Sequence, residues 1–310
     1  MTALRVIFDR SAFHGERFEL LKHCGLRDAV ARQQITVLLT PVFLNETLTA
    51  YGSPKPSGWK EHLNFALDLA SGIFRDRADI FREELLMGRG PFARPLVSHS
   101  VPRRRRESRR QPLVSQRRRR ESPHQQLVAM LREVAGGRSL ATEWIETKEA
   151  RDEAFRKGKN QARLSQEIRE EIATKFGASP TPTELAQYPF AQMRKNEGER
   201  TGRQLMSIVS APRAGVLGDQ WARAPHRFPF YSAFVDGFMY NGYYAALEHH
   251  ERIDRNAQAD YEQLAYLTWA DLMVSNDTRF MRHAFDAIWR PRGKRLETAE
   301  GFAALVRTLS

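Results

Sequence analysis

Four acidic residues, far apart in the chain, occupy positions at which an α/β protein gathers its chemistry. Asp9 and Asp277 each follow a short apolar run, whereas Glu46 and Asp260 lie in early turns of expected helices. In parallel α/β folds functional groups collect at the carboxyl ends of the strands, so these carboxylates can meet at one edge. Carboxylates packed closely repel one another unless a cation neutralises them, and hard oxygen ligands suit Mg²⁺ or Mn²⁺. Such an ion can activate a water for phosphodiester cleavage.

Each of these acids also has a purely structural interpretation. An aspartate just after a strand commonly forms a turn, and Glu46 taken alone resembles an exposed helix residue. Asp271 lies eleven residues after Asp260, which places it about 16 Å further along an unbroken helix. It therefore either supports the metal ligands from behind or simply begins a strand. The metal hypothesis depends on all four acids meeting at one place.

The elements that would position these acids follow from the apolar pattern. Short aliphatic runs predict buried strands over 4–8, 35–40 and 271–275. The stretch 293–309 predicts a short strand and a final helix, with Thr298 as its N-cap. Strands that alternate with helices indicate an α/β fold, whose central and mostly parallel sheet is flanked by helices.

Amphipathic spacing predicts the helices between these strands. One helical pattern covers 16–34, and another begins at Pro41 after the second strand. The stretch 59–88 predicts one or two further helices. Apolar and aromatic residues at helical spacing return at 229–250 and continue to residue 270.

The middle of the chain differs in composition from both ends. Residues 1–87 and 228–310 carry the α/β pattern, as two parts of one core. Residues 88–126 contain a tandem duplication of PLVS and RRRRES blocks, rich in Pro, Ser and like charge, which predicts a disordered loop. Residues 127–227 are polar and mainly helical, as expected of an insertion.

The positive charge is concentrated in that loop. The chain has a formal net charge of +12, and residues 103–120, with ten arginines and one glutamate, supply +9 of it. We weigh three interpretations: contact with nucleic-acid phosphates, binding of an acidic protein, or a neutral expansion that a loop tolerates. The candidate nucleic-acid contacts are the two runs Arg103, Arg104, Arg105, Arg106 and Arg117, Arg118, Arg119, Arg120.

Composition narrows the class of protein further. Cys24 is the single cysteine, so an intramolecular disulfide framework and a cysteine-rich zinc site are excluded. The longest strongly apolar stretch, ITVLLTPVFL, is far below membrane-span length, and the N-terminal apolar run is too short for a signal peptide. We therefore expect a soluble cytoplasmic protein with no membrane contact.

A set of aromatic residues near the later acids could offer stacking faces for unpaired bases. Their helical spacing favours core packing instead. The set comprises Phe234, Tyr240, Tyr243, Tyr244, Tyr261, Tyr266 and Trp269.

The blocks VIFDRSAF, TPVFLNETL and DYEQLAYLTWADLMVSNDTRFM together resemble the successive motifs of PIN-domain nucleases. The resemblance covers roughly 1–87 and 228–310, and the intervening residues depart from the compact family core. It implies metal ligation by Asp9, Glu46, Asp260 and Asp277. It also places Ser275 at the family's small hydroxyl position and Phe280 at its aromatic position.

The resemblance implies a metal-dependent endoribonuclease that uses Mg²⁺ or Mn²⁺ and acts on single-stranded or structured RNA. Many relatives of this kind are toxins, so an inhibitory, antitoxin-like partner protein is a further expectation. Two rivals remain open. One is a non-catalytic nucleic-acid-binding or regulatory protein that keeps the fold, and the other is a nuclease that cuts DNA at the same acids.

Overall fold

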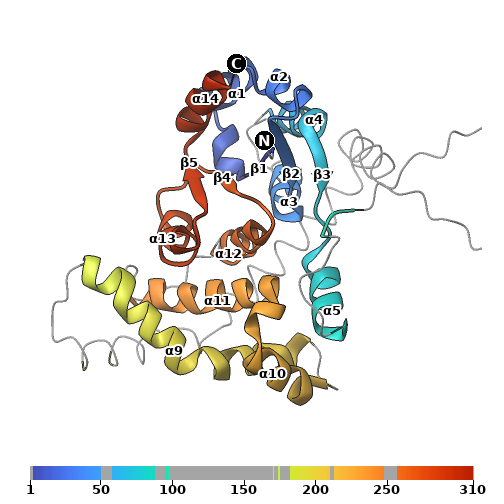
Figure 1. The fold of residues 1–310 in the computed structure, drawn as a ribbon. Coiled ribbons are helices and arrows are strands. Elements are labelled where there is room, and N and C mark those ends of the chain that lie inside the picture. The colour runs from blue at the N-terminus through green and yellow to red at the C-terminus, as the bar shows by residue number, and fades with distance from the viewer. Residues whose placement is uncertain are drawn as a thin grey trace, which may run out of the picture.

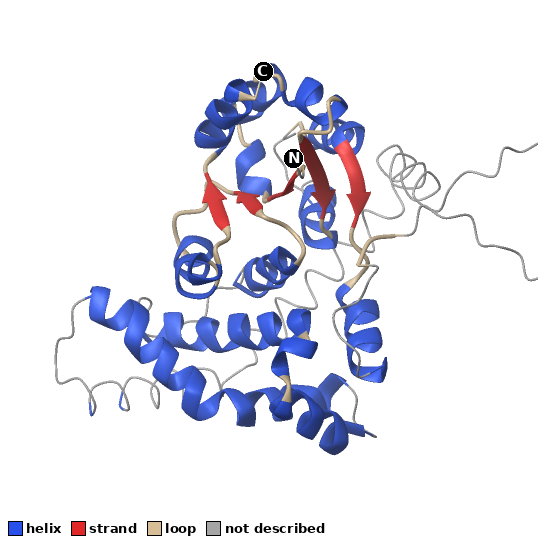
Figure 2. Cartoon of the chain, viewed as in Figure 1, coloured by secondary structure: helices blue, strands red, loops and turns tan. Residues whose placement is uncertain are grey.

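The computed structural model describes residues 3–49, 58–87, 95–97, 182–209, 213–247 and 257–309, together with residues 170 and 174. Its strands are β1 (Leu4–Phe8), β2 (Ile35–Leu39), β3 (Ala70–Ile73), β4 (Leu272–Val274) and β5 (Arg295–Glu297). They form one sheet in the order β3-β2-β1-β4-β5, and every neighbouring pair is parallel (Figures 1 and 2). The predicted α/β fold with a parallel sheet flanked by helices is confirmed.

Helices before and after the sheet strands account for most of the remaining described residues. The first half contains α1 (Glu16–His23), α2 (Leu26–Ala31), α3 (Pro41–Thr49), α4 (Trp59–Leu69) and α5 (Arg77–Met87). The second half contains α9 (Pro182–Val209), α10 (Ala214–Arg223), α11 (Pro229–Leu247), α12 (Ala257–Ala265), α13 (Phe280–Ile288) and α14 (Ala299–Thr308). Short 3-10 helices are η1 (Arg10–Phe13), η4 (Pro225–Arg227), η5 (Tyr266–Thr268) and η6 (Arg290–Arg292).

The strands bury side chains on both faces of the sheet. Along β1, Val6 and Phe8 belong to one hydrophobic core, whereas Ile7 between them belongs to the other. Met273 in β4 shares the core of Ile7, and its neighbour Leu272 shares the core of Val6. Successive strand residues point to opposite faces, so a continuously apolar run is what a parallel sheet covered on both sides requires.

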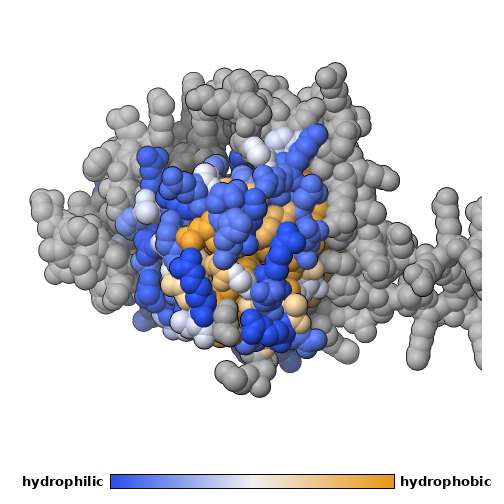
Figure 3. All heavy atoms as spheres, turned by 90° about the horizontal axis from the view of Figure 1, so that it is seen from above, coloured by the Kyte–Doolittle hydropathy of each residue, from blue (hydrophilic) through white to orange (hydrophobic). Residues whose placement is uncertain are grey.

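One face of the sheet is covered by α1, α2, α4 and α14, which lie at the top of Figure 1. Figure 3 looks down onto this side of the molecule and shows apolar residues amid hydrophilic ones. Partly buried residues such as Leu20, Val30 and Leu305 pack at the margin of this core. Gly25, with a φ of 87°, separates α1 from α2, so the helical pattern expected over 16–34 forms two helices.

The other face carries several layers of helices. α12 and α13 lie below the sheet in Figure 1, α11 crosses beneath them, and α9 and α10 lie beneath α11. Phe190 of α9 and Trp221 of α10 belong to the same hydrophobic core as Ile7 of the sheet. The described helices of the expected insertion are therefore packed onto the core.

The strand β3 corrects the expectation of uninterrupted helices over 59–88. α4 ends at Leu69, and Ala70–Ile73 pairs in parallel with β2. Residues 95–97, expected within a disordered loop, run along the outer edge of β3: Val97 N donates to Ile73 O at 2.8 Å. Gly72 permits this approach, because a Cβ there would lie 3.0 Å from Leu96 Cδ1. The rest of the expected loop lies outside the described residues.

The last strand and helix match their sequence pattern. The hydroxyl of Thr298 accepts a hydrogen bond from Gly301 N at 3.1 Å and caps α14, as predicted. No helix in the described part of the chain has the length and apolar character needed to cross a bilayer.

Candidate functional site at the carboxyl edge of β1 and β4

The order in which the chain adds strands reverses between β1 and β4. From β1 the chain moves outward to β2 and β3, whereas β4 and β5 lie on the opposite side of β1. In open parallel sheets the crevice at such a switch point, beyond the carboxyl ends of the strands, is the usual ligand site. Asp9 directly follows β1, and Ser275 directly follows β4.

Asp9 is buried and bonded to donors from both strands. Its Oδ2 accepts hydrogen bonds from Ser11 N at 3.1 Å, from the Ser11 hydroxyl, and from Ser275 Oγ at 2.9 Å. Asp9 also caps η1, which is the turn-forming role expected of an aspartate in this position. Within the described part of the chain, Oδ1 accepts no comparable hydrogen bond.

Ser275 connects the two predicted acidic positions. Its side chain is fully buried, and its Oγ donates to Asp9 Oδ2 while accepting from Asp277 N at 3.1 Å. Asp277 Oδ1 in turn accepts from Arg279 N at 2.6 Å, which closes a turn before α13. Asp9 and Asp277, 268 positions apart in the chain, therefore lie two hydrogen bonds from each other.

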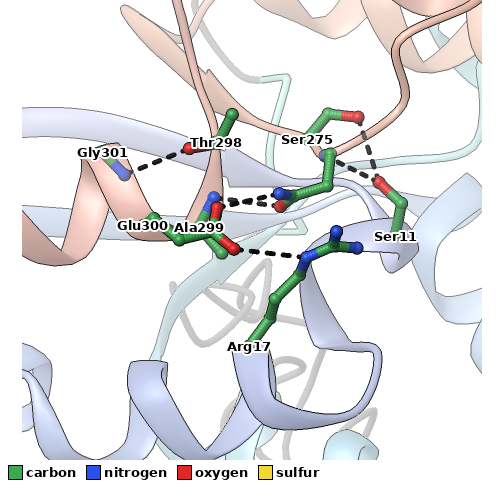
Figure 4. Close-up of polar contacts among 8 residues, drawn as sticks. Ser11, Arg17, Ser275, Thr298, Ala299, Glu300 and Gly301 are labelled. Carbon is green, nitrogen blue, oxygen red and sulfur yellow. Dashed lines mark hydrogen bonds and ion pairs between the residues drawn. The ribbon is translucent and has the colours of Figure 1, made fainter.

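A polar network around Asn276 fixes the loop that carries Asp277. Asn276 N donates to Ser11 Oγ at 2.9 Å, and Asn276 Nδ2 donates to Glu300 Oε2 at 2.9 Å. Glu300 also pairs with Arg17 at 3.3 Å (Figure 4). The hydrogen bond from Asn276 is the main reason that the pKa of Glu300 falls to about 2. This network joins the ends of β1 and β4 to the first turns of α1 and α14.

Asp260 and Glu46 lie on helices that pack around the same edge. Asp260 is buried in α12, and Gln263, one turn later on the same face, donates to Phe8 O at 2.6 Å. Glu46 lies on α3, directly after β2, and α3 packs against both η1 and α12. The charges of Glu46 and Asp9 both act on the guanidinium of Arg10. All four predicted acids thus surround the carboxyl edge of the central strands.

The described residues contain no group of three or more His, Cys, Asp or Glu side chains arranged to hold a metal ion. Asp9 and Asp277 are linked through Ser275, whose hydroxyl bonds the carboxylate of the first and the backbone N of the second. The oxygen donors are those that Mg²⁺ or Mn²⁺ prefers. The carboxylate oxygens therefore fit such an ion. The feature that fits it least is that Asp9 Oδ2 already accepts three hydrogen bonds.

Three basic residues beside these acids were not identified from the sequence. Arg10 is the first residue of η1, His14 directly follows η1, and His62 comes from α4. Burial, followed by the positive charges of Arg10 and His14, lowers the pKa of His62 to about 4. The pKa of His14 is also lowered, first by burial and then by Arg10. Ser11, two residues after Asp9, could have been predicted from the sequence, because short polar side chains commonly form turns at such positions. No local pattern marks His62.

Of the two roles expected for Asp271, the structure shows the start of a strand and not support of the acidic residues at the carboxyl edge. It precedes β4, at the opposite end of the strand from Ser275, and pairs with Arg5 at 2.7 Å. Arg5 N also donates to Asp271 Oδ2 at 3.1 Å. The pair therefore aligns the starts of β1 and β4, away from the acidic edge.

The aromatic set proposed as an alternative base-stacking surface belongs to the core. Tyr240, Tyr261 and Tyr266 are among its buried members, and Trp269 is partly buried against the same cluster. Phe280 is also buried, where it contacts Tyr244 edge to face at 5.4 Å between ring centroids. The arginines at 103–106 and 117–120 lie outside the described residues.

A separate cavity of about 650 Å³ lies away from these acids, between α9, α10, α11 and α13. Its lining includes Phe190, Trp221 and the buried Asp236. Arg194 and Arg292 each pair with Asp236 at 2.5 Å. A buried carboxylate is stable only when it is paired, and these two ion pairs also connect α9 and η6 to α11. Asp236 therefore has a structural role.

Comparison with models of protein families, with curated proteins and with solved structures finds no match to this chain.

Proposed function

We propose that this chain is a metal-dependent endoribonuclease whose centre lies at the carboxyl edge of β1 and β4. The observation that carries the proposal is the Asp9–Ser275–Asp277 link. It joins two acids from opposite halves of the sequence at the switch point of a parallel sheet, where ligands bind in such folds. The sequence resemblance to PIN-domain nucleases supports the same assignment.

Asp9, Glu46, Asp260 and Asp277 would hold Mg²⁺ or Mn²⁺, which supplies an activated water and stabilises the leaving oxygen in phosphodiester hydrolysis. The protein's own contribution is to hold these carboxylates in place. The Ser275 hydroxyl fixes Asp9 Oδ2 and the Asp277 backbone together, and Asn276 anchors the loop to Ser11 and α14. Because Oδ2 of Asp9 is already bonded, its other oxygen is the one directed to a ligand.

The proposal includes two further properties that the resemblance implies: the substrate is RNA, and an inhibitory protein partner restrains the activity. The cytoplasmic location, expected from composition, is part of the same proposal. The arginine blocks at 103–106 and 117–120 would raise the local concentration of substrate through phosphate contacts.

The test is cleavage of an end-labelled pool of single-stranded RNA in Mn²⁺, compared with EDTA. The informative variant is Asp9→Asn with Asp277→Asn, and the matched control is Asp271→Asn, at the opposite end of β4. We expect cleavage that needs metal, is lost in the double variant and persists in the control. Cleavage that survives in the double variant would refute the assignment of the centre to these acids.

A second candidate is a nucleic-acid-binding protein without catalysis. It is favoured by the three donors to Asp9 Oδ2 and by the lack of a three-residue metal group among the described residues. In that case the acids only shape the loops. RNA binding that needs neither metal nor the two acids, with no cleavage, would establish this function in place of the first. A parallel pool of single-stranded DNA tests the remaining rival, a DNA-cutting enzyme.

A further inference from the structure

Three basic side chains that carry N–H donors border the acidic edge; we name Arg10, His14 and His62 the basic rim. Arg10 and His14 come from the segment that directly follows β1. The His62 ring, from α4, lies 5.9 Å from the ring centroid of Phe13 and 4.3 Å from that of Phe18. Phe13 lies in η1, so His62 is held over the same turn that presents the other two residues.

Arg10 is only partly satisfied by the protein around it. Its Nε is buried and has no hydrogen-bond partner in the described part of the chain. A buried donor without a partner costs about 1–3 kcal/mol, so such groups in a native protein call for an explanation. The planar guanidinium, with five N–H donors, is well suited to phosphate oxygens. Because Arg10 as a whole is only partly buried, an anion would meet the guanidinium at its outer N–H groups, not at the buried Nε.

Burial, and after it the positive charge of Arg10, lowers the pKa of both His14 and His62. A nearby like charge disfavours the charged form of a group, whereas a nearby opposite charge favours it. An anion bound among the three side chains would therefore favour protonated imidazoles, in which both ring nitrogens donate. The rim therefore has the donors and the charge arrangement of a phosphate-binding site.

We infer that the basic rim binds the backbone phosphate of single-stranded RNA next to the phosphate that lies at the acids. The inference rests on the proposed function, because it takes the acidic edge as the place of cleavage. Asp9 and Arg10 are adjacent in the chain, so a strand on the rim passes directly beside the acids. The neighbouring rings Phe13 and Phe18 are buried, which leaves the phosphate as the group recognised. Binding at the rim should thus carry little sequence preference.

The experiment measures binding of a fluorescent ten-nucleotide oligouridylate by the full-length protein, in EDTA, over a range of salt concentrations. The variants are Arg10→Met, His62→Gln and His14→Gln. Matched controls are Arg32→Met and His23→Gln, exposed residues at the ends of α2 and α1. Circular dichroism checks that each variant is folded. The exposed His14 keeps the test valid if substitution of the more buried Arg10 prevents folding.

We expect Arg10→Met to weaken binding about tenfold, as loss of one charge-assisted contact does. It should also reduce the slope of log affinity against log salt by about 0.7, the value for one phosphate of a single strand. A purely structural role would leave that slope unchanged. His62→Gln and His14→Gln should weaken binding about threefold, and the controls should bind as the wild type does.

The outcomes separate this inference from the proposed function. Metal-dependent cleavage that needs Asp9 and Asp277, together with unchanged binding and salt slope in the rim variants, would overturn the inference alone. Rim-dependent RNA binding without any cleavage in Mn²⁺ would support the rim and overturn the nuclease. Equal, rim-dependent binding of a DNA oligonucleotide of matching sequence would support the phosphate contact, whereas binding that depends on the RNA sugar would overturn recognition of the phosphate alone.

Discussion

Glu84 offers the sharpest test of the energetics of this fold. It lies on α5, its side chain is fully buried, and its two carboxylate oxygens accept Phe230 N at 2.9 Å and Tyr231 N at 2.8 Å. These donors belong to the first turn of α11, which otherwise has unsatisfied N–H groups. Glu84 thus caps a helix that begins 145 residues later in the chain.

Burial raises the pKa of Glu84 to about 7, although the two backbone N–H groups act in the opposite direction. In the unfolded chain the same carboxyl titrates near 4.5. Between these two values the folded protein binds the proton and the unfolded chain does not, so stability falls as the pH rises. A displacement of this size corresponds to about 3 kcal/mol at pH 8 relative to pH 4.

The perturbation is Glu84→Gln, which replaces the carboxyl by an uncharged group of the same shape. The amide keeps one oxygen acceptor but turns its NH₂ group toward the second backbone N–H, so near pH 4.5 the free energy of unfolding of the variant should lie about 1–3 kcal/mol below that of the wild type. Above that pH only the wild type loses stability through this group, so the difference should shift in favour of the variant by about 3 kcal/mol by pH 8. Urea unfolding, followed by circular dichroism between pH 4.5 and 8, measures this difference.

The matched control is Glu83→Gln, because Glu83 is the preceding residue on α5 and pairs with Arg75 in a partly exposed position. The difference in unfolding free energy between Glu83→Gln and the wild type should not shift toward the variant as the pH rises. If the difference in unfolding free energy between Glu84→Gln and the wild type does not change with pH, or if the wild type gains on the variant as the pH rises, the reasoning is wrong. The helix N-terminus would then stabilise the carboxylate enough to offset its burial.

Three further perturbations test other parts of the structure. Ser275→Ala removes a buried hydroxyl bonded to a carboxylate and to a backbone N–H, so urea unfolding at pH 7 should show a loss of about 2 kcal/mol. Gly202→Ala places a Cβ 2.2 Å from the Trp221 ring and should cost at least about 2 kcal/mol by the same measurement. The lowered pKa of His62 means that the unfolded chain takes up a proton near pH 6.5 but the folded protein only near 4. The free energy of unfolding should therefore fall by about 1 kcal/mol as the pH is lowered through that window, a value reduced for the partial exposure of this group. Urea titrations of His62→Gln should lack that part of the fall.

Each of these perturbations has a control and a contrary result. Ser207→Ala on α9 breaks only a local bond to Gln204 O, and an equal loss in both serine variants would refute the special role of Ser275. Gly215→Ala in α10 meets no atom within 4 Å and should stabilise the helix by up to about 1 kcal/mol. Equal effects of the two glycine variants on the free energy of unfolding would refute the clash with Trp221. His23→Gln should leave the dependence of the unfolding free energy on acidic pH unchanged. If His62→Gln also leaves it unchanged, the argument from the lowered pKa of His62 is wrong.

The sequence alone was sufficient for the architecture of the central strands. The runs at 4–8, 35–40 and 271–275 have apolar side chains at adjacent positions, such as Val6 and Ile7, which is typical of a strand in a sheet covered on both faces. Period and composition are local properties, so they can be read without the fold. The cap at Thr298 was legible for the same reason.

The strand β3 could not be predicted from the sequence, because its four residues ASGI directly follow α4 and no turn residue precedes them. Its pairing with β2, and with residues 95–97 along its outer edge, depends on contacts that the local pattern does not encode. The role of Asp271 was equally undetermined, since only the alignment of β1 with β4 brings Arg5 to it.

For the candidate site, the sequence determined which acids stand after strands, and it supplied their oxygen chemistry. The tertiary structure decided how they are connected: Ser275 joins Asp9 to Asp277 because β1 and β4, distant in sequence, are neighbours in the sheet. It also decided that His62 lies beside Arg10, through the packing of α4 on η1 and α1. Residue type and period are fixed by the chain itself, whereas the meeting of side chains from separate elements exists only once those elements have packed.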